Sequence, residues 1–193
     1  MIILNKYMKK TDIIFSIVCG LSVAWIANDF FNKIGWIFFL VLPVLSVVGL
    51  WLVNLIGEKV LFVKQVGKFV LVGAFADVID IKVFQFLFLF APFSITFKAV
   101  SFLVATLVKF WWNKHWAFER HEKEGAKKEA VQFFGVTLGG LLLNLGSFYY
   151  FTKVMGPQFS MPVETWTELC IIFAALVAAV WNFCGYKFLV FKK

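Results

Sequence analysis

The stretch Val108–Phe118 reads Val-Lys-Phe-Trp-Trp-Asn-Lys-His-Trp-Ala-Phe, an apolar run that closes in an aromatic cluster around a lysine. Near the end of the chain, Asn182–Phe191 reads Asn-Phe-Cys-Gly-Tyr-Lys-Phe-Leu-Val-Phe. Alignment on the two lysines pairs five positions: Phe110 with Phe183, Trp112 with Gly185, Asn113 with Tyr186, Lys114 with Lys187 and Phe118 with Phe191. Such self-similarity predicts a tandem repeat of one supersecondary unit. A fainter third copy spans Asn54–Val63.

The composition is that of a membrane protein. Hydrophobic residues make up 62% of the 193-residue chain. Charged residues make up only 16%, against roughly 25% in soluble domains. The formal net charge of +8 is compatible with nucleic-acid binding, but cytoplasmic loops of membrane proteins also collect lysine and arginine. We therefore expect a chain embedded in lipid and no nucleic-acid partner.

Six apolar runs predict six membrane-spanning helices. Their approximate ranges are 13–31, 35–56, 68–91, 95–113, 131–152 and 166–188. Each run is near the ~20 residues that a helix needs to cross the hydrocarbon core. The backbone must satisfy its own hydrogen bonds in lipid, and the alternating pattern of membrane strands is missing from the sequence, so helices are expected. The predicted fold is an all-α membrane protein with six transmembrane helices in three hairpins.

The basic residues predict the orientation of these helices. Most of the 19 basic residues fall at the two ends of the chain, in the connection between the second and third runs, and in the connection between the fourth and fifth. The other connections hold Lys33, Lys98 and Lys153. By the positive-inside rule, both termini are cytoplasmic. Each motif copy then closes a hairpin on the same side, which predicts parallel pseudo-repeats related by an axis near the membrane normal.

The motifs resemble those of the GtrA family of small membrane proteins. The resemblance is carried by the hairpin endings Asn113–Phe118 and Lys187–Phe191, and by a helix that opens Phe-x-x-x-Gly and carries an acid one or two turns later. Here that helix reads Phe69–Gly73 and is followed by Asp77 and Asp80. The chain departs from the family pattern in its additional N-terminal hairpin, since the family usually has four helices. It departs again where a tyrosine replaces the asparagine in the second ending.

The resemblance covers roughly residues 66–193 and implies two domains. Residues 1–63 would form an N-terminal helical hairpin, and residues 64–193 a GtrA-like domain with hairpins at about 66–118 and 130–191. The family is associated with polyprenyl-phosphate-linked sugars and with glycosylation of cell-surface polysaccharide or teichoic acid. The resemblance therefore implies a flippase for a polyprenyl-phosphate carrier or its glycosylated form in the inner (cytoplasmic) membrane.

Two acids lie inside a predicted span and are candidates for an intramembrane polar or proton site. Asp77 and Asp80 are three residues apart and share a helix face. Counting ~1.5 Å per residue from Lys68 places Asp80 about 18 Å into the membrane. Ionisable groups at such depth are costly and are functional candidates by default. An alternative is a buried pair that locks to Lys109 or Asn144 and only stabilises packing.

A second group of polar residues predicts a binding site for a phosphate headgroup. Its members are Lys59, Lys109, Asn113, Lys114, Asn182 and Lys187. The aligned lysines of the three copies would bring ammonium groups to one depth on the cytoplasmic side, where lysine binds phosphate as a point charge. Ordinary positive-inside anchoring explains the same lysines equally well.

Known enzyme motifs are missing from the sequence, and the two histidines have no metal-ligand spacing, so we expect no enzyme, metal or cofactor. Three functions remain open. The first is a polyprenyl-phosphate flippase, and the second is a non-transporting anchor or accessory subunit of a membrane glycosyltransferase. The third is a small cation or drug exporter that uses Asp77 and Asp80. A homo-oligomer is plausible in the first case, because six short helices enclose little volume for a glycolipid.

Overall fold

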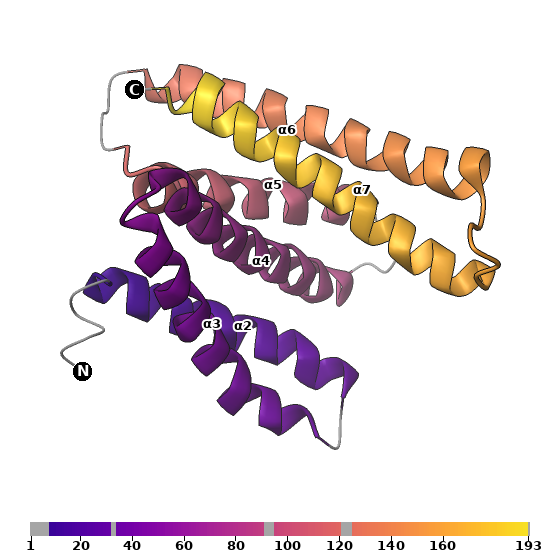
Figure 1. Ribbon diagram of the computed structural model, residues 1–193, viewed down its shortest axis with the longest axis horizontal. Coiled ribbons are helices and arrows are strands. Elements are labelled where there is room, and N and C mark those ends of the chain that lie inside the picture. The colour runs from indigo at the N-terminus through magenta and orange to yellow at the C-terminus, as the bar shows by residue number, and fades with distance from the viewer. Residues whose placement is uncertain (1–7, 32–33, 91–94, 121–124, 193) are drawn as a thin grey trace. The chain divides into compact units, whose positions relative to one another are not determined.

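The computed structural model describes residues 8–31, 34–90, 95–120 and 125–192, and divides into two compact units, residues 1–121 and 122–193. Within the described ranges the chain forms six α-helices and three short π-helical segments, and no β-strand (Figure 1). The first unit holds α2 (Lys10–Phe30), α3 (Gly35–Gly57), α4 (Leu61–Phe88), α5 (Ile95–Trp112) and η1 (Asn113–Ala117). The second unit holds α6 (Ala126–Tyr149), η2 (Tyr150–Met155), α7 (Val163–Gly185) and η3 (Tyr186–Val190). The all-helical fold class is confirmed.

Among the residues that the structure describes, four stretches are long and apolar enough to cross a membrane. They are Lys10–Asp29, Gly35–Gly57, Lys127–Met155 and Ile172–Val190. Much of their surface is exposed aliphatic or aromatic side chain, as a lipid-facing surface requires. The protein is therefore a multi-pass membrane protein. The six-span topology and the cytoplasmic placement of both termini stay predictions, as does the domain boundary at residue 64.

Helix α4 begins earlier than the apolar pattern predicts. It starts at Leu61 and runs for 28 residues, and only a short turn separates it from α3. Lys64 and Lys68 therefore belong to the helix, so their prediction as part of a charged connection was wrong. Lys68 is fully buried, and its charge is accommodated by carboxylates from other elements.

Two ion pairs hold α2 alongside α4 in a parallel arrangement. Near the start of both helices, Lys68 Nζ lies 3.1 Å from Asp12 Oδ1. Near their ends, Lys82 Nζ lies 2.6 Å from Asp29 Oδ2. Lys82 also lies over the ring of Trp25, 4.4 Å from its centroid. One pair joins the beginnings of the two helices and the other joins their ends, so α2 and α4 run in the same direction.

The core of the first unit forms where α2, α3, α4 and η1 meet. It is a cluster of five buried side chains, Met8, Phe15, Leu50, Val72 and Trp116. Phe15 is central to it, with ring centroids 4.3 Å from those of both Trp112 and Trp116. Helix α2 approaches α3 closely at Gly20, because a Cβ there would collide with the backbone of Pro43. The N-terminal hairpin is thus packed against the first hairpin of the GtrA-like region.

In the second unit, Tyr186, the first residue of η3, packs against α6. Its ring stacks on Phe133 with centroids 4.0 Å apart, and its hydroxyl lies 2.7 Å from Thr137 Oγ1. Trp181 Nε1 donates to the carbonyl of Val136 on α6 at 3.0 Å. These contacts leave Tyr186 fully buried, so the tyrosine that departs from the family pattern fills the core of this hairpin.

The predicted repeat is visible in the backbone. In the first unit, the N–H of Phe118 donates to the carbonyl of Asn113 at 2.9 Å. In the second, the N–H of Phe191 donates to the carbonyl of Tyr186 at 2.7 Å. Each bond spans five residues and closes a single π-helical turn, η1 or η3, at aligned positions. The tentative third copy differs, because α3 ends at Gly57 and a turn leads directly into α4.

Candidate functional site

The two π-helical endings present a lysine and an aromatic ring in the same way. Lys114 Nζ lies 6.0 Å from the centroid of the Phe110 ring, and Lys187 Nζ lies 5.8 Å from that of Phe183. Both pairs have the i, i+4 spacing that places side chains on one helix face. An ammonium group at this distance is attracted by the ring face. The repeat therefore extends from the backbone to side chains whose chemistry suits an anion and a hydrocarbon chain.

The aligned positions before each lysine are buried. Asn113 and Tyr186 are fully covered, and Lys114 is only 3% exposed. Asn113 Nδ2 donates to the carbonyl of Lys109 at 2.9 Å, whereas its Oδ1 is buried without a hydrogen-bond partner among the described residues. An unmatched buried acceptor costs roughly 1–3 kcal/mol. Such an oxygen binds a hydroxyl or water and repels a phosphate oxygen, so Asn113 fits a role beside an anion better than a role as its ligand.

Two further asparagines are also buried and have side-chain amide atoms without a described hydrogen-bond partner. Asn182 on α7 is buried and its Oδ1 lacks a partner in the described part of the chain. Its side chain lies against Gly140 of α6, where a Cβ would overlap it. Asn54 on α3 is 2% exposed and neither of its amide atoms has a described partner. The asparagines that open the copies Asn54–Val63 and Asn182–Phe191 are thus both buried.

Lys59 occupies a different environment from the other aligned lysines. It lies exposed in the turn between α3 and α4, whereas Lys114 is buried in η1 of the same unit. Lys187 belongs to the second unit. Convergence of the three ammonium groups stays a prediction.

The two acids predicted to lie in the membrane, Asp77 and Asp80, belong to α4 and face different surroundings. Asp80 Oδ1 accepts a hydrogen bond from Ser101 Oγ at 2.6 Å, and Ser101 is fully buried. Asp77 is exposed and lies close enough to Lys109 on α5 for coulombic attraction. Ser101 as the partner of Asp80 was missed by sequence reasoning. Asn144 is half-buried on α6, in the second unit.

A buried ionic network that the sequence did not reveal joins α2, α4 and η1. Asp12 and Lys68 side chains are each 1% exposed and form the 3.1 Å ion pair. Trp116 Nε1 donates to Asp12 Oδ1 at 2.7 Å, and Lys68 donates to the Trp116 carbonyl at 3.4 Å. The second carboxylate oxygen of Asp12 accepts from the backbone N–H of Lys9 at 3.0 Å, which also caps the start of α2. One buried acid thus holds the tryptophan of the first π-helical ending.

Glu119 extends the network towards solvent. Its Oε1 lies 3.2 Å from Lys68 Nζ, 3.3 Å from Lys9 Nζ and 3.9 Å from Lys64 Nζ. Partial burial on its own raises the pKa of Glu119, but the three ammonium groups outweigh it and the pKa lies below its ordinary value. Glu119 is therefore held as a carboxylate at the end of η1.

The fold and these endings define a multi-pass helical membrane protein built on two hairpins that end in the same lysine-aromatic turn. The sequence matches the family described as GtrA/DPMS, transmembrane domain, over residues 68–191, and the chain belongs to this family. The predicted resemblance is confirmed. No curated protein and no solved structure matches the chain. The match begins within α4, so α2 and α3 precede the family domain. Family membership suggests a membrane protein in processes that involve polyprenyl-phosphate sugars.

Proposed function

We propose that the protein moves a polyprenyl-phosphate carrier, free or joined to a sugar, across the cytoplasmic membrane without chemical change to it. One observation carries the proposal: both repeats end in a π-helical turn that sets a lysine over the face of a phenylalanine, Lys114 over Phe110 and Lys187 over Phe183. A phosphate monoester carries up to two negative charges and has three strong acceptor oxygens. The lysines supply its counter-charge, and Phe110, which is partly exposed where Phe183 is buried, supplies apolar surface for the first carbons of the chain.

A polar contact deeper in the first hairpin supports a transport role. The charged headgroup has to cross hydrocarbon, where an unpaired charge costs several kcal/mol. Asp80 and Ser101 bond to each other between α4 and α5, and in the proposed six-span topology they would lie within the hydrocarbon. Ser101 holds the Asp80 carboxyl in the contact between these two helices, where a passing headgroup would meet it.

The hydrogen bond between Ser101 and Asp80 also favours the alternative function, an accessory subunit of a membrane glycosyltransferase. The bond of Asp80 to Ser101 satisfies the carboxylate within the helix pair and explains its presence by packing alone. An accessory subunit needs no moving lipid, only a stable surface for its partner. Movement of lipid by the isolated protein separates the two functions.

The test is a lipid-movement assay in phosphatidylcholine vesicles that contain only this protein and a fluorescent short-chain polyprenyl phosphate. Lys114→Gln/Lys187→Gln should slow movement by at least ten-fold, since each basic residue contributes roughly 1 kcal/mol to binding of a surface anion. Lys127→Gln/Lys128→Gln, at the exposed start of α6, removes the same charge and should leave the rate unchanged. Vesicles in which the unaltered protein moves no lipid would rule out the flippase and leave the accessory subunit.

Asp80→Asn in the same assay tests the deeper site. The amide keeps the shape of the carboxylate and can still bond to Ser101, but it cannot carry a proton. We expect unchanged expression and helix content with loss of movement. A variant that moves lipid at the original rate but unfolds at a lower temperature would assign Asp80 to packing.

A further inference from the structure

The three-lysine cluster, Lys9, Lys64 and Lys68, surrounds a single carboxylate oxygen. All three ammonium groups lie within 3.9 Å of Glu119 Oε1. Lys68 is buried and also pairs with Asp12, whereas the Lys9 and Lys64 side chains are 66% and 27% exposed. Counting both carboxylates, the network keeps one excess positive charge. It is therefore a site for one anionic group with more charge than a carboxylate, now filled by a side chain of the protein itself.

Glu119 is held in this position against its backbone preference. Its φ is +51°, in the left-handed region that residues other than glycine seldom adopt. Strain of this kind persists where surrounding contacts impose it, and it is found at ligand sites and switches. The Glu119 side chain is 39% exposed, so it can leave the cluster without opening the core. Asp12 and Trp116, which are buried, would keep Lys68 in place.

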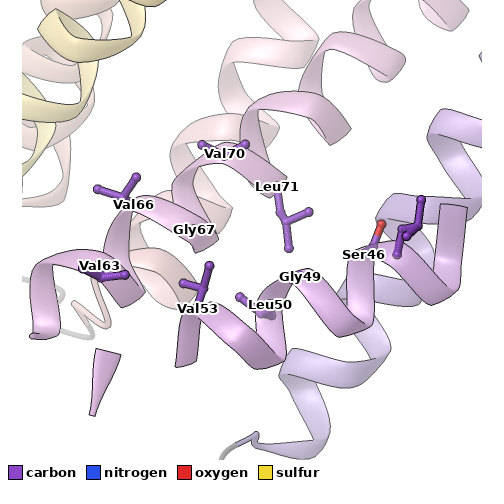
Figure 2. A pocket seen from close by; sticks show the side chains of 10 residues that line it. Ser46, Gly49, Leu50, Val53, Val63, Val66, Gly67, Val70 and Leu71 are labelled. Carbon is purple, nitrogen blue, oxygen red and sulfur yellow. The ribbon is translucent and has the colours of Figure 1, made fainter. Parts of the chain in front are cut away.

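An apolar groove lies between α3 and α4 beside this cluster. Its volume is about 380 Å³, and its walls are almost entirely aliphatic (Figure 2). The lining residues come from both helices: Leu45, Ser46, Gly49, Leu50, Val53, Val63, Val66, Gly67, Val70 and Leu71. A Cβ at Gly49 would meet nothing within 4 Å, so the missing side chain there opens space for a hydrocarbon chain.

The groove and the cluster adjoin on α4. Lys64 follows the lining residue Val63 directly and precedes the lining residue Gly67 by three positions, which is one helical turn. Lys64 also packs against Gly57 at the end of α3. A lipid whose chain enters the groove would therefore bring its headgroup to the start of α4, where Lys64 and its neighbours lie.

We propose that the three-lysine cluster binds the phosphate of a polyprenyl monophosphate whose chain lies in the α3–α4 groove, and that Glu119 is an internal anion which the phosphate displaces. The inference rests on the proposed function and adds a second phosphate site, outside the matched Lys-Phe endings. A monoester phosphate suits this site because its three acceptor oxygens match three ammonium donors. The phosphodiester of a common phospholipid has a single charge and two free oxygens. It also carries two chains, whereas the groove offers a volume of about 380 Å³.

Binding of farnesyl phosphate to the full chain in phosphatidylcholine nanodiscs tests the headgroup site. Glu119→Gln removes the competing charge and should tighten binding at least five-fold. Lys64→Gln leaves the Asp12–Lys68 pair intact and should weaken binding at least ten-fold. Lys127→Gln, an exposed lysine of the second unit, is the matched control and should change nothing. Equal affinities for the unaltered protein, Glu119→Gln and Lys64→Gln would overturn the proposal.

Filling the groove tests the chain site. Gly49→Leu should weaken binding of farnesyl phosphate at least ten-fold without loss of folding, because its side chain extends into open space. Gly146→Leu on α6, where a Cβ also meets nothing, is the matched control. Competition with phosphatidic acid, a monoester with two chains, decides the source of the ligand. If phosphatidic acid displaces farnesyl phosphate at equal concentration, the commitment to a polyprenyl lipid is wrong.

The binding assay tests this site and the movement assay tests the proposed function, so the result of one does not decide the other. Binding that depends on Glu119 and Gly49 in a protein that moves no lipid would overturn the proposed function and keep this site. Movement of lipid with no dependence of binding on Glu119 or Gly49 would do the reverse.

Discussion

Asp12 Oδ1 and Lys68 Nζ lie 3.1 Å apart with both side chains almost completely buried. This pair connects the N-terminal hairpin to the helix with which the GtrA/DPMS match begins, at residue 68. Trp116 of the first π-helical ending bonds to the same carboxylate. The extra hairpin is therefore a structural support for the family motif and not an independent appendage.

Asp12→Asn should destabilise the first unit markedly. Removal of one partner leaves a buried ammonium short of a counter-charge, which typically costs 3–5 kcal/mol. Because Glu119 still neutralises part of the Lys68 charge, we expect the lower end, about 3 kcal/mol. The measurement is thermal unfolding in detergent.

Two variants serve as controls for this prediction. Asp29→Asn breaks the outer ion pair to Lys82, whose side chains are 39% and 17% exposed, and should cost at most about 1 kcal/mol. Asp12→Asn/Lys68→Met removes both buried charges and should recover part of the loss. Equal destabilisation by Asp12→Asn and Asp29→Asn would contradict the assigned importance of the buried pair.

Stability should fall in acid through Glu119. Its folded-state pKa lies below the ordinary value of 4.5, so the folded state binds this proton less readily than the unfolded state. The contribution of Glu119 is complete above the ordinary value and is lost as the pH falls through the lowered pKa. Unfolding temperatures should be compared between pH 7 and pH 3. Glu119→Gln should show a smaller decrease, and an unchanged decrease would assign the acid sensitivity to other carboxylates.

Tyr186 offers a graded test of the second hairpin. Tyr186→Phe keeps the stacking on Phe133 and loses only the hydrogen bond to Thr137, which also bonds to the Phe133 carbonyl. We expect a loss of about 1 kcal/mol. Tyr186→Asn copies the residue of the first repeat but removes the buried ring, and should cost about 3–5 kcal/mol by analogy with other aromatic truncations. Similar losses for the two variants would show that the ring contributes little.

Accessibility of engineered tags tests the topology. Tags at Met1 and Lys193 should be reached only from the cytoplasmic side, and a tag in the connection Gly156–Pro162 only from outside. The parallel arrangement of α2 and α4 within the first unit agrees with this orientation. Termini on opposite sides of the membrane would exclude parallel repeats.

The sequence predicted helices well where apolar length was the deciding factor. Helix α3 spans Gly35–Gly57, within a residue of the apolar run, because a helix in lipid ends where its apolar residues end. The start of α4 was misplaced because Lys64 and Lys68 were assigned to the connection between the second and third apolar runs, whereas α4 begins at Leu61. Nothing local marks Lys68 as buried, since its partner Asp12 is 56 positions away in the sequence.

The candidate site was predicted only in part, because some of its contacts join residues that are distant in the sequence. The alignment found the equivalence of Lys114 and Lys187, which the matching π-turns and phenylalanine contacts confirm as a structural repeat. The alignment could not predict whether each lysine is buried or exposed, because burial depends on elements outside the motif. Asp12 was the one available signal: it is the first acid of the sequence and stands at the start of an apolar run, where a charge without a partner would be costly.

The π-helical turns η1 and η3 change the direction of the side chains that follow them. A π-turn holds one residue more than an α-turn, so every side chain beyond it is rotated by about 100° relative to an uninterrupted helix. Phe118 and Phe191, which follow the two turns directly, are both buried. Both repeats carry the additional residue at the same aligned position, and the alignment needs no gap. The additional residue is therefore part of the repeated unit itself, and it sets the same change of side-chain direction at the end of each hairpin.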